Sequence, residues 1–328
     1  MYNYAIFIPL RGINNLRNTI IQCEQWLSDQ VNNAHAKGIV LGLSGGIDSS
    51  VLAAIGREAL GRDGVLGVIM PCHSIQDDEA DARLLAEAVD VDFVRVDLSG
   101  VYDALCAGVL MCDPQTERDS QPVIYAPNWV QDSQPATYAT NSVHDSQPAT
   151  YTTNLVHDSQ PATYTTNSVR DSQPLAHAHD SHALDSLTRS NIKARLRMVT
   201  LYAFAQSRNL LVCGTSNRSE YETGYFTKYG DSGVDLMPLA GFLKRDIRKM
   251  ARLLNVPERI ITKAPSAGLY AGQTDESDMG FTYDILDEYL ATGHINDPAA
   301  QQRIDVMRRR SEHKRKPIPI FRVSSEQQ

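Results

Sequence analysis

The segment Ile39-Val40-Leu41-Gly42-Leu43-Ser44-Gly45-Gly46-Ile47-Asp48-Ser49-Ser50 decides the fold of this 328-residue chain. An apolar run that meets two glycines predicts a buried strand that turns sharply into a helix. Such a turn directs several backbone N–H groups into one concavity at the positive end of a helix dipole, where phosphate or pyrophosphate binds. Ser44 and Ser49 add hydroxyl donors, and the Asp48 carboxylate suits Mg²⁺. The alternative is a tight turn without a ligand, in which Ser49 caps the helix.

The glycine-rich loop lacks the lysine of the Walker phosphate-binding pattern. No lysine occurs between Lys37 and Lys193, so any lysine that reaches the phosphates must come from a distant part of the chain. The candidates are three basic clusters, at residues 193–197, 244–249 and 313–316.

Strands and helices alternate on both sides of this loop. We expect helices at 13–36, 78–89, 101–111, 187–207 and 244–255, with another running through Val51 to Leu60. We expect strands at 39–43, 65–70, 93–96 and 210–215. This order predicts an α/β fold with a doubly wound parallel sheet and helices on both faces. Ligands bind such sheets at the carboxyl ends of the strands, where the glycine-rich loop falls.

A tandem repeat interrupts this pattern. Asp-Ser-Gln-Pro occurs five times between residues 119 and 174, with a period of 13 residues. Each copy offers too few apolar side chains to offset the entropy of ordering the chain. We therefore expect an irregular, exposed insert at 113–186 that separates the two parts of one domain, 1–112 and 187–328. The functional alternative is a segment that docks partner proteins.

The composition excludes several classes of protein. A net charge of −8 argues against a general binder of nucleic acid or membrane surfaces. The five cysteines contain no C-x-x-C pair, which fits reduced thiols better than a disulfide framework or a zinc site. No run approaches the 18 or so apolar residues of a membrane span, and no secretory signal is recognised, so we expect a cytoplasmic protein.

Three segments after the repeat have the residues of a ligand site. Residues 191–198 carry several cations, residues 214–220 end a strand with a hydroxyl and Glu220, and residues 224–233 combine glycines, aromatic rings and Lys228. Each segment also has a structural explanation: a solvated basic helix face, a helix-start acid and a surface turn. Aromatic residues grouped in one loop favour packing against a ligand ring.

The order of these segments resembles the ammonia-dependent NAD synthetases. The motifs are SGGIDSS, NIKARLRM, GTSNRSE, GYFTKYGDSG, APSAGLYAGQTDE and EHKRK, and together they cover nearly the whole chain outside 113–186. SGGIDSS alone resembles the pyrophosphate loop of the wider superfamily of N-type ATP pyrophosphatases, which split ATP between the α and β phosphates. The resemblance implies a single domain with a fold like that of the adenine-nucleotide alpha-hydrolases, which is Rossmann-like.

The resemblance also implies the roles of individual residues. ATP contacts fall on Gly42, Leu43, Ser44, Gly45, Gly46, Ile47, Asp48, Ser49, Thr215, Lys244 and Ser266. Asp48 and Glu220 would bind Mg²⁺, and Asp48 and Lys244 would be catalytic. The deamido-NAD site would comprise Arg195, Lys228, Asp235, His313 and Lys314. The chain departs from the family pattern at Ser266, where threonine is usual, and at Ile47, where glutamine is frequent.

The activity implied by this resemblance is amidation of deamido-NAD to NAD, the last step of NAD biosynthesis. ATP would adenylate the substrate, ammonia would displace AMP, and the enzyme would be a homodimer without a nucleic-acid or membrane partner. One alternative is another ATP pyrophosphatase, either GMP-forming or tRNA-modifying. A tRNA thiolase, however, needs paired catalytic cysteines and a basic surface, and this sequence has neither feature. The other alternative is a catalytically silent nucleotide-binding scaffold that docks partners through its repeat.

Overall fold

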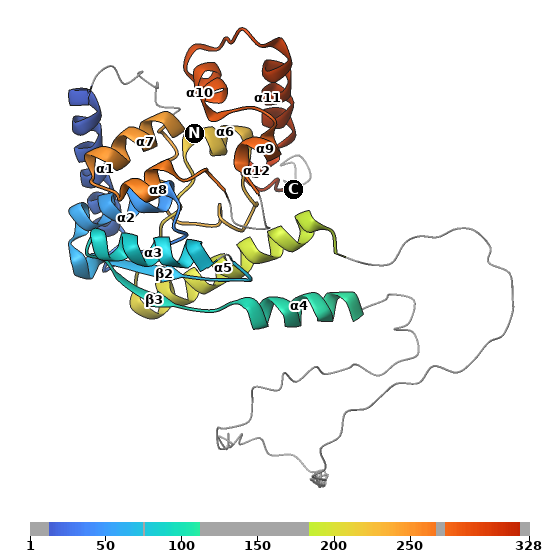
Figure 1. Cartoon of the computed structure of the whole chain (residues 1–328). Helices are drawn as coiled ribbons and strands as arrows, with labels where there is room; N and C mark the ends of the chain where they lie inside the picture. The colour runs from blue at the N-terminus through green and yellow to red at the C-terminus, as the bar shows by residue number, and fades with distance from the viewer. Residues whose placement is uncertain (1–12, 75, 112–183, 267–272, 322–328) are drawn as a thin grey trace, which may run out of the picture. The chain divides into compact units, whose positions relative to one another are not determined.

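Parallel strands form the centre of the computed structural model, which describes residues 13–74, 76–111, 184–266 and 273–321 (Figure 1). The described strands are β1 (Ile39–Gly42), β2 (Val65–Ile69), β3 (Asp92–Arg95) and β4 (Leu211–Val212). Their order across the sheet is β3-β2-β1-β4, and every pairing is parallel. The chain builds outward from β1 to β3 and then returns to the other side of β1. This reversal creates a crevice at the carboxyl end of β1, which is the usual ligand position in such sheets.

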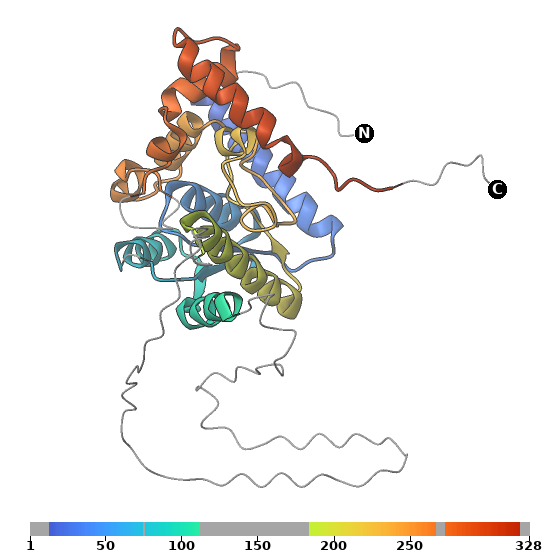
Figure 2. The same cartoon turned by 90° about the vertical axis from the view of Figure 1, so that its right-hand side faces the viewer.

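Helices cover both faces of the sheet, because alternate residues of each strand point to opposite sides. Ile39 and Leu41 of β1 pack with one group of helices, whereas Val40 packs with the other. The first group contains α1 (Ile13–Asn33), α2 (Ile47–Leu60), α3 (Gln76–Ala88), α7 (Lys244–Leu253) and α8 (Glu258–Thr262). The second contains α4 (Ser99–Met111) and α5 (Ser186–Arg208), which lie side by side in Figures 1 and 2. The predicted parallel sheet with helices on both faces is confirmed.

A separate group of helices follows the sheet, and the sequence patterns did not predict it. It contains α9 (Asp275–Met279), α10 (Tyr283–Thr292), α11 (Pro298–Arg310) and α12 (Glu312–Arg315). The first three bury their own apolar cluster around Tyr283, Leu286 and Ile304. The short helix α6 (Arg218–Thr223) connects β4 to this group, because α10 and α11 both pack against it. Among the described residues, no helix has the length and apolar character needed to cross a membrane.

The predicted boundaries lie within four residues of the observed ones, and two of the differences are informative. β4 ends at Val212 instead of 215, and beyond it Cys213 forms only an isolated parallel bridge with Leu236. α5 begins at Ser186, one residue before the predicted start, because the Asp185 side chain accepts a hydrogen bond from Thr188 N and caps the helix. Residues 113–183 of the predicted insert lie outside the described residues, so the insert remains a prediction.

Gly45 brings the glycine-rich loop against α3. Its φ is +74°, and a Cβ at this position would lie 2.4 Å from Asp78 O and 2.9 Å from the Asp81 Cβ. Gly61 has the same φ of +74° but no atom within 4 Å of its Cβ position. The two glycines therefore separate the effect of backbone conformation from the effect of close packing.

We expect Gly61→Ala to lower the free energy of unfolding by about 1–3 kcal/mol, because its backbone (φ +74°, ψ 178°) lies in a region that essentially only glycine adopts. Gly45→Ala should lower it by about 2 kcal/mol more, because α3 must also shift to remove the overlap. Urea unfolding of both variants measures the difference. Equal losses would show that α3 does not restrain the loop.

Candidate active site

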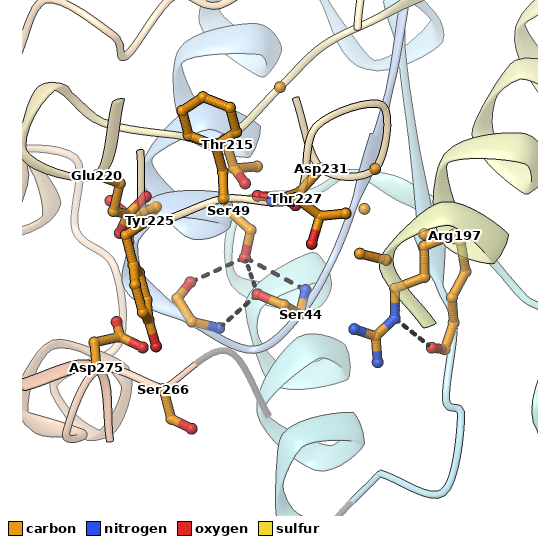
Figure 3. A pocket seen from close by; sticks show the side chains of 18 of the residues that line it. Ser44, Ser49, Arg197, Thr215, Glu220, Tyr225, Thr227, Asp231, Ser266 and Asp275 are labelled. Carbon is orange, nitrogen blue, oxygen red and sulfur yellow. Dashed lines mark hydrogen bonds between the residues drawn. The ribbon is translucent and has the colours of Figure 1, made fainter. Parts of the chain in front are cut away.

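A cavity of about 750 Å³ lies at the carboxyl end of β1, in the crevice that the strand order creates (Figure 3). The glycine-rich loop, α5, the start of α7 and residues 224–234 all contribute to its wall. The wall contains every predicted ATP residue except Gly45: Gly42, Leu43, Ser44, Gly46, Ile47, Asp48, Ser49, Thr215, Lys244 and Ser266. Residues predicted from four separate segments therefore meet around one space.

Hydroxyl groups shape the glycine-rich loop from within. Ser49 Oγ donates to Gly46 O at 2.9 Å, and Ser44 Oγ accepts from Gly46 N at 3.2 Å. The two hydroxyl oxygens lie 3.1 Å apart. Gly46 occupies the N-cap position of α2 without any side-chain cap, so the prediction that Ser49 caps the helix is wrong. The start of this 14-residue helix therefore faces the cavity with its dipole open to an anion.

A buried lysine joins the two predicted metal-binding carboxylates. Lys244 Nζ lies 2.6 Å from Asp48 Oδ2 and 3.1 Å from Glu220 Oε1. Asn217 Nδ2 donates to Asp48 Oδ1 at 2.8 Å and fixes the other side of that carboxylate. Burial alone would lower the pKa of Lys244, but Asp48 and Glu220 outweigh it and raise the pKa above its ordinary value. Lys244 is therefore a permanent cation at this site.

Glu220 is held by its own helix and by a neighbouring ring. It forms a capping box with Asn217 at the start of α6, and Tyr283 Oη donates to Glu220 Oε1 at 3.2 Å. Burial raises the pKa of Glu220 to about 7, against the opposing effect of Lys244. Tyr283 Oη also lies 2.9 Å from Asp275 Oδ2, so a third carboxylate joins the cluster.

The donor set at this cluster fits Mg²⁺ shared with a polyphosphate. Among the residues that the structure describes, no group of three or more His, Cys, Asp or Glu side chains is placed to hold a metal ion. Proteins commonly hold Mg²⁺ through one or two carboxylates, with phosphate and water completing the octahedron. Asp48 and Glu220 both line the cavity and meet that requirement. Asp275 Oδ1 is a further buried oxygen without a hydrogen-bond partner in the described part of the chain.

The predicted deamido-NAD residues divide between the cavity and the outer surface. Lys314 lines the cavity, where its Nζ donates to Gly224 O at 2.8 Å and to Phe226 O at 2.6 Å. Arg195, Lys228 and His313 form a chain outside it. Arg195 Nη2 donates to Lys228 O at 3.3 Å, and Lys228 Nζ donates to His313 O at 2.9 Å.

Asp235 also lies outside the cavity wall. Its carboxylate accepts hydrogen bonds from Tyr202 Oη at 3.0 Å and from Val212 N at 2.8 Å. The second bond attaches the segment after the aromatic loop to β4. The structure thus brings only Lys314 of the five predicted residues into the cavity.

Arg197 is a cavity residue to which the sequence assigned no role beyond membership of a basic cluster. Its guanidinium donates to Met70 O at 3.3 Å and to Ser74 Oγ at 3.4 Å, and it forms no ion pair with the described residues. Burial lowers its pKa. Figure 3 shows Arg197 on one side of the glycine-rich loop and Glu220 and Asp275 on the other. The cavity wall therefore also carries a cation on the side of the loop away from Glu220 and Asp275.

Comparison with known proteins identifies the family. The sequence profile described as NAD synthase matches residues 19–120 and 135–318. This chain belongs to the NAD synthase family. The NH(3)-dependent NAD(+) synthetase of Finegoldia magna is 40% identical over 292 residues, which cover 89% of this chain and 90% of that protein. The synthetase of the same name from Carboxydothermus hydrogenoformans is 36% identical, covering 89% and 91%.

Solved structures with this fold include two other synthetases. NAD+ synthetase from Burkholderia pseudomallei superposes with a TM-score of 0.60 and 25% identity, covering 94% of this chain and 92% of that one. NMN synthetase from Francisella tularensis superposes with a TM-score of 0.68 and 29% identity, covering 94% and 99%. The family assignment therefore rests on sequence and fold together.

The buried state of Glu220 predicts a pH dependence of stability. Between its ordinary pKa of 4.5 and its folded pKa of about 7, the folded protein holds a proton that the unfolded chain releases. The free energy of unfolding should therefore fall as pH rises through this window, by on the order of 1–3 kcal/mol for this group. In Glu220→Gln, the free energy of unfolding should lack the fall that is caused by deprotonation of Glu220.

Urea unfolding of the wild type and of Glu220→Gln, with EDTA present, measures this contribution at about pH 5 and about pH 7.5. The other carboxylates are common to both proteins, so the difference between the two pH slopes isolates Glu220. Identical slopes would show that Glu220 titrates normally.

Proposed function

We propose that this chain makes NAD from deamido-NAD, ATP and ammonia, releasing AMP and pyrophosphate. One observation carries the proposal: a buried lysine bridges two carboxylates beside an open glycine-rich loop, in a chain of the NAD synthase family. The loop supplies a site for the pyrophosphate, and Lys244 supplies positive charge at that site. Relatives that share 33–40% identity carry the name NH(3)-dependent NAD(+) synthetase, which supports ammonia as the nitrogen source.

In the first step, the nicotinate carboxylate attacks the α-phosphorus of ATP. A carboxylate–phosphorus bond forms, the bond to the β-phosphate oxygen breaks, and pyrophosphate leaves with the electron pair. The glycine-rich loop holds the leaving group, and the Lys244 ammonium stabilises its growing negative charge. Mg²⁺ held by Asp48 and Glu220 would supply further Lewis-acid stabilisation. Reaction depends on positioning more than on covalent catalysis.

In the second step, ammonia attacks the adenylated carbonyl carbon, and AMP leaves with the former carboxylate oxygen. No protein nucleophile is needed. Cys213 is the one described cysteine in the cavity wall, and burial raises its pKa so that the thiol keeps its proton at neutral pH. This arrangement disfavours a sulfur-transfer enzyme, which needs a reactive thiolate.

Incubation of the purified protein with ATP, deamido-NAD, ammonium and Mg²⁺ tests the proposal. NAD and AMP should form in equal amounts, and EDTA should stop the reaction. With glutamine in place of ammonium, we expect no NAD. Equal rates with glutamine would contradict ammonia as the substrate, and ATP cleavage without amide formation would contradict the whole assignment.

Asp48→Asn should lower the turnover number by at least about a hundredfold, because the variant loses a carboxylate that contacts Lys244 and would hold Mg²⁺. The matched control is Asp29→Asn, which makes the same change on α1, away from the cavity. Thermal unfolding checks that both variants fold. Near-normal turnover of folded Asp48→Asn would remove this residue from the mechanism.

Similarity to the Francisella tularensis NMN synthetase supports a second candidate substrate, the mononucleotide nicotinate mononucleotide. The same cavity and the same two steps would serve either molecule, since the reacting carboxylate is shared. Parallel assays that compare kcat/KM for deamido-NAD and nicotinate mononucleotide decide between them. The curated relatives favour deamido-NAD as the better substrate.

The same proposal includes a homodimer. Along one face of α4, Val101, Leu105 and Val109 remain 53%, 43% and 46% exposed. On the adjoining helix α5, Val199 is 59% exposed and lies one turn after Arg195. Arg195, a predicted dinucleotide residue outside the cavity, thus shares a helix face with the exposed Val199, as expected if deamido-NAD binds near a subunit boundary.

Leu105→Glu should convert the dimer to a monomer, because a charge would replace an apolar side chain at the centre of the α4 face. Leu84→Glu is the control, since Leu84 is 39% exposed on α3, outside this face. Light scattering coupled to size-exclusion chromatography measures the mass of each variant. A monomeric wild type, or a dimeric Leu105→Glu, would contradict this interface.

A further inference from the structure

Helix α10 contributes no residue to the described cavity wall, yet it contacts the residues that carry the site's charges. Tyr283 and Asp287 are both fully buried. They are four residues apart and therefore lie on the same helix face. Their contacts reach the backbone at the start of α7 and the ammonium of Lys244.

Asp287 anchors the start of α7. Arg245 N donates to its Oδ2 at 2.7 Å, and Ser219 Oγ donates to its Oδ1 at 2.5 Å. The same Ser219 oxygen accepts from Lys244 N at 3.1 Å. The N-cap residue of α7, Leu243, has no side-chain oxygen, so a carboxylate from another helix supplies the acceptor that α7 lacks. Its negative charge also faces the positive end of the α7 dipole.

Tyr283 contacts the other end of Lys244. The Lys244 Nζ lies 4.7 Å from the centre of the Tyr283 ring, a distance at which the ring attracts the cation. The Tyr283 hydroxyl lies 3.2 Å from Glu220 Oε1 and 2.9 Å from Asp275 Oδ2. One face of α10 thus holds both the backbone and the side chain of Lys244, together with its partner carboxylate.

We infer that α10 sets the position of the Lys244 ammonium between Asp48 and Glu220, with Asp287 and Tyr283 as positioning residues. Asp287 also helps to position Glu220, because it binds the hydroxyl of Ser219, the residue that precedes Glu220 in α6. The kinetic consequence rests on the proposed function, in which Lys244 stabilises the leaving pyrophosphate. A displacement of about 1 Å at such a charge can reduce the rate a hundredfold.

The Tyr283→Phe variant removes the hydroxyl but keeps the ring beneath Lys244. We expect kcat to fall about tenfold or more, with the KM for ATP within about twofold of the wild type. The control is Tyr289→Phe on the same helix, which loses a hydroxyl bond of 2.6 Å to Asp305 away from the cavity. This control should keep the wild-type kcat. Equal kcat values for the two variants would overturn the inference.

The Asp287→Asn variant tests the anchor at α7. The expected result is a kcat at least about tenfold lower, with ATP affinity by calorimetry within about twofold of the wild type, because the glycine-rich loop lies elsewhere. Asp284→Asn makes the same change at an exposed position of α10 and should leave kcat unchanged. If Asp287→Asn does not fold, Ser219→Ala removes one of the same contacts and should also lower kcat. A folded Asp287→Asn or Ser219→Ala with wild-type kcat would contradict the anchor.

A measurement without turnover separates this inference from the proposed function. Urea unfolding of Tyr283→Phe, Glu220→Gln and the double variant should show effects that do not add. The same cycle with Tyr289→Phe should show additive effects, since Tyr289 bonds to Asp305 instead. Additive effects in both cycles would overturn the inference. The proposed function is decided by a different measurement, which is whether the wild-type protein forms NAD.

Discussion

The Lys244 ammonium, buried between Asp48 and Glu220, is the constraint on which the rest of this structure depends. Taking three charged groups out of water costs several kcal/mol each unless their partners are placed closely. The three residues come from the first turn of α2, from α6 and from the start of α7. The strand order, the Asn217 amide and the Tyr283 ring all serve to bring them together. Apolar residues of similar size could stabilise a fold equally well, so stability alone does not explain why these charges are buried here.

The balance of charge at this cluster is a reason to propose a divalent cation for the reaction. One lysine faces two carboxylates, so with Glu220 ionised the cluster is negative before ATP arrives. A triphosphate brought there would be repelled without a further positive charge. Arg197 cannot supply that charge at the same place, since Figure 3 shows it on the other side of the glycine-rich loop.

Much of this arrangement could be predicted from the sequence, because local patterns determine it. The apolar runs predicted strands β1 and β2, and the glycine-rich loop predicted a cavity at the carboxyl end of β1. The contacts between distant segments could not be predicted in this way. Arg195 and Arg197 are two positions apart on one helix, and only the rotation of α5 in the fold brings Arg197 into the cavity wall. The bond between Asn217 and Asp48 likewise joins residues 169 positions apart.

A second lysine shows how the two parts of the chain complete one site. Lys263 Nζ lies 2.8 Å from Asp78 and 2.6 Å from Asp81, both on α3, the helix that also contacts Gly45. In both ion-pair clusters a lysine from the later part of the chain meets a carboxylate from the earlier part.

The earlier part therefore supplies the glycine-rich loop and the later part supplies the cations, so the cavity wall needs both. Figure 1 shows α4 ending and α5 beginning on the same side of the sheet, so the fold itself places little limit on the length of chain between them. Doubling the length of such a connection costs only about 0.6 kcal/mol, which a site held by buried ion pairs can tolerate.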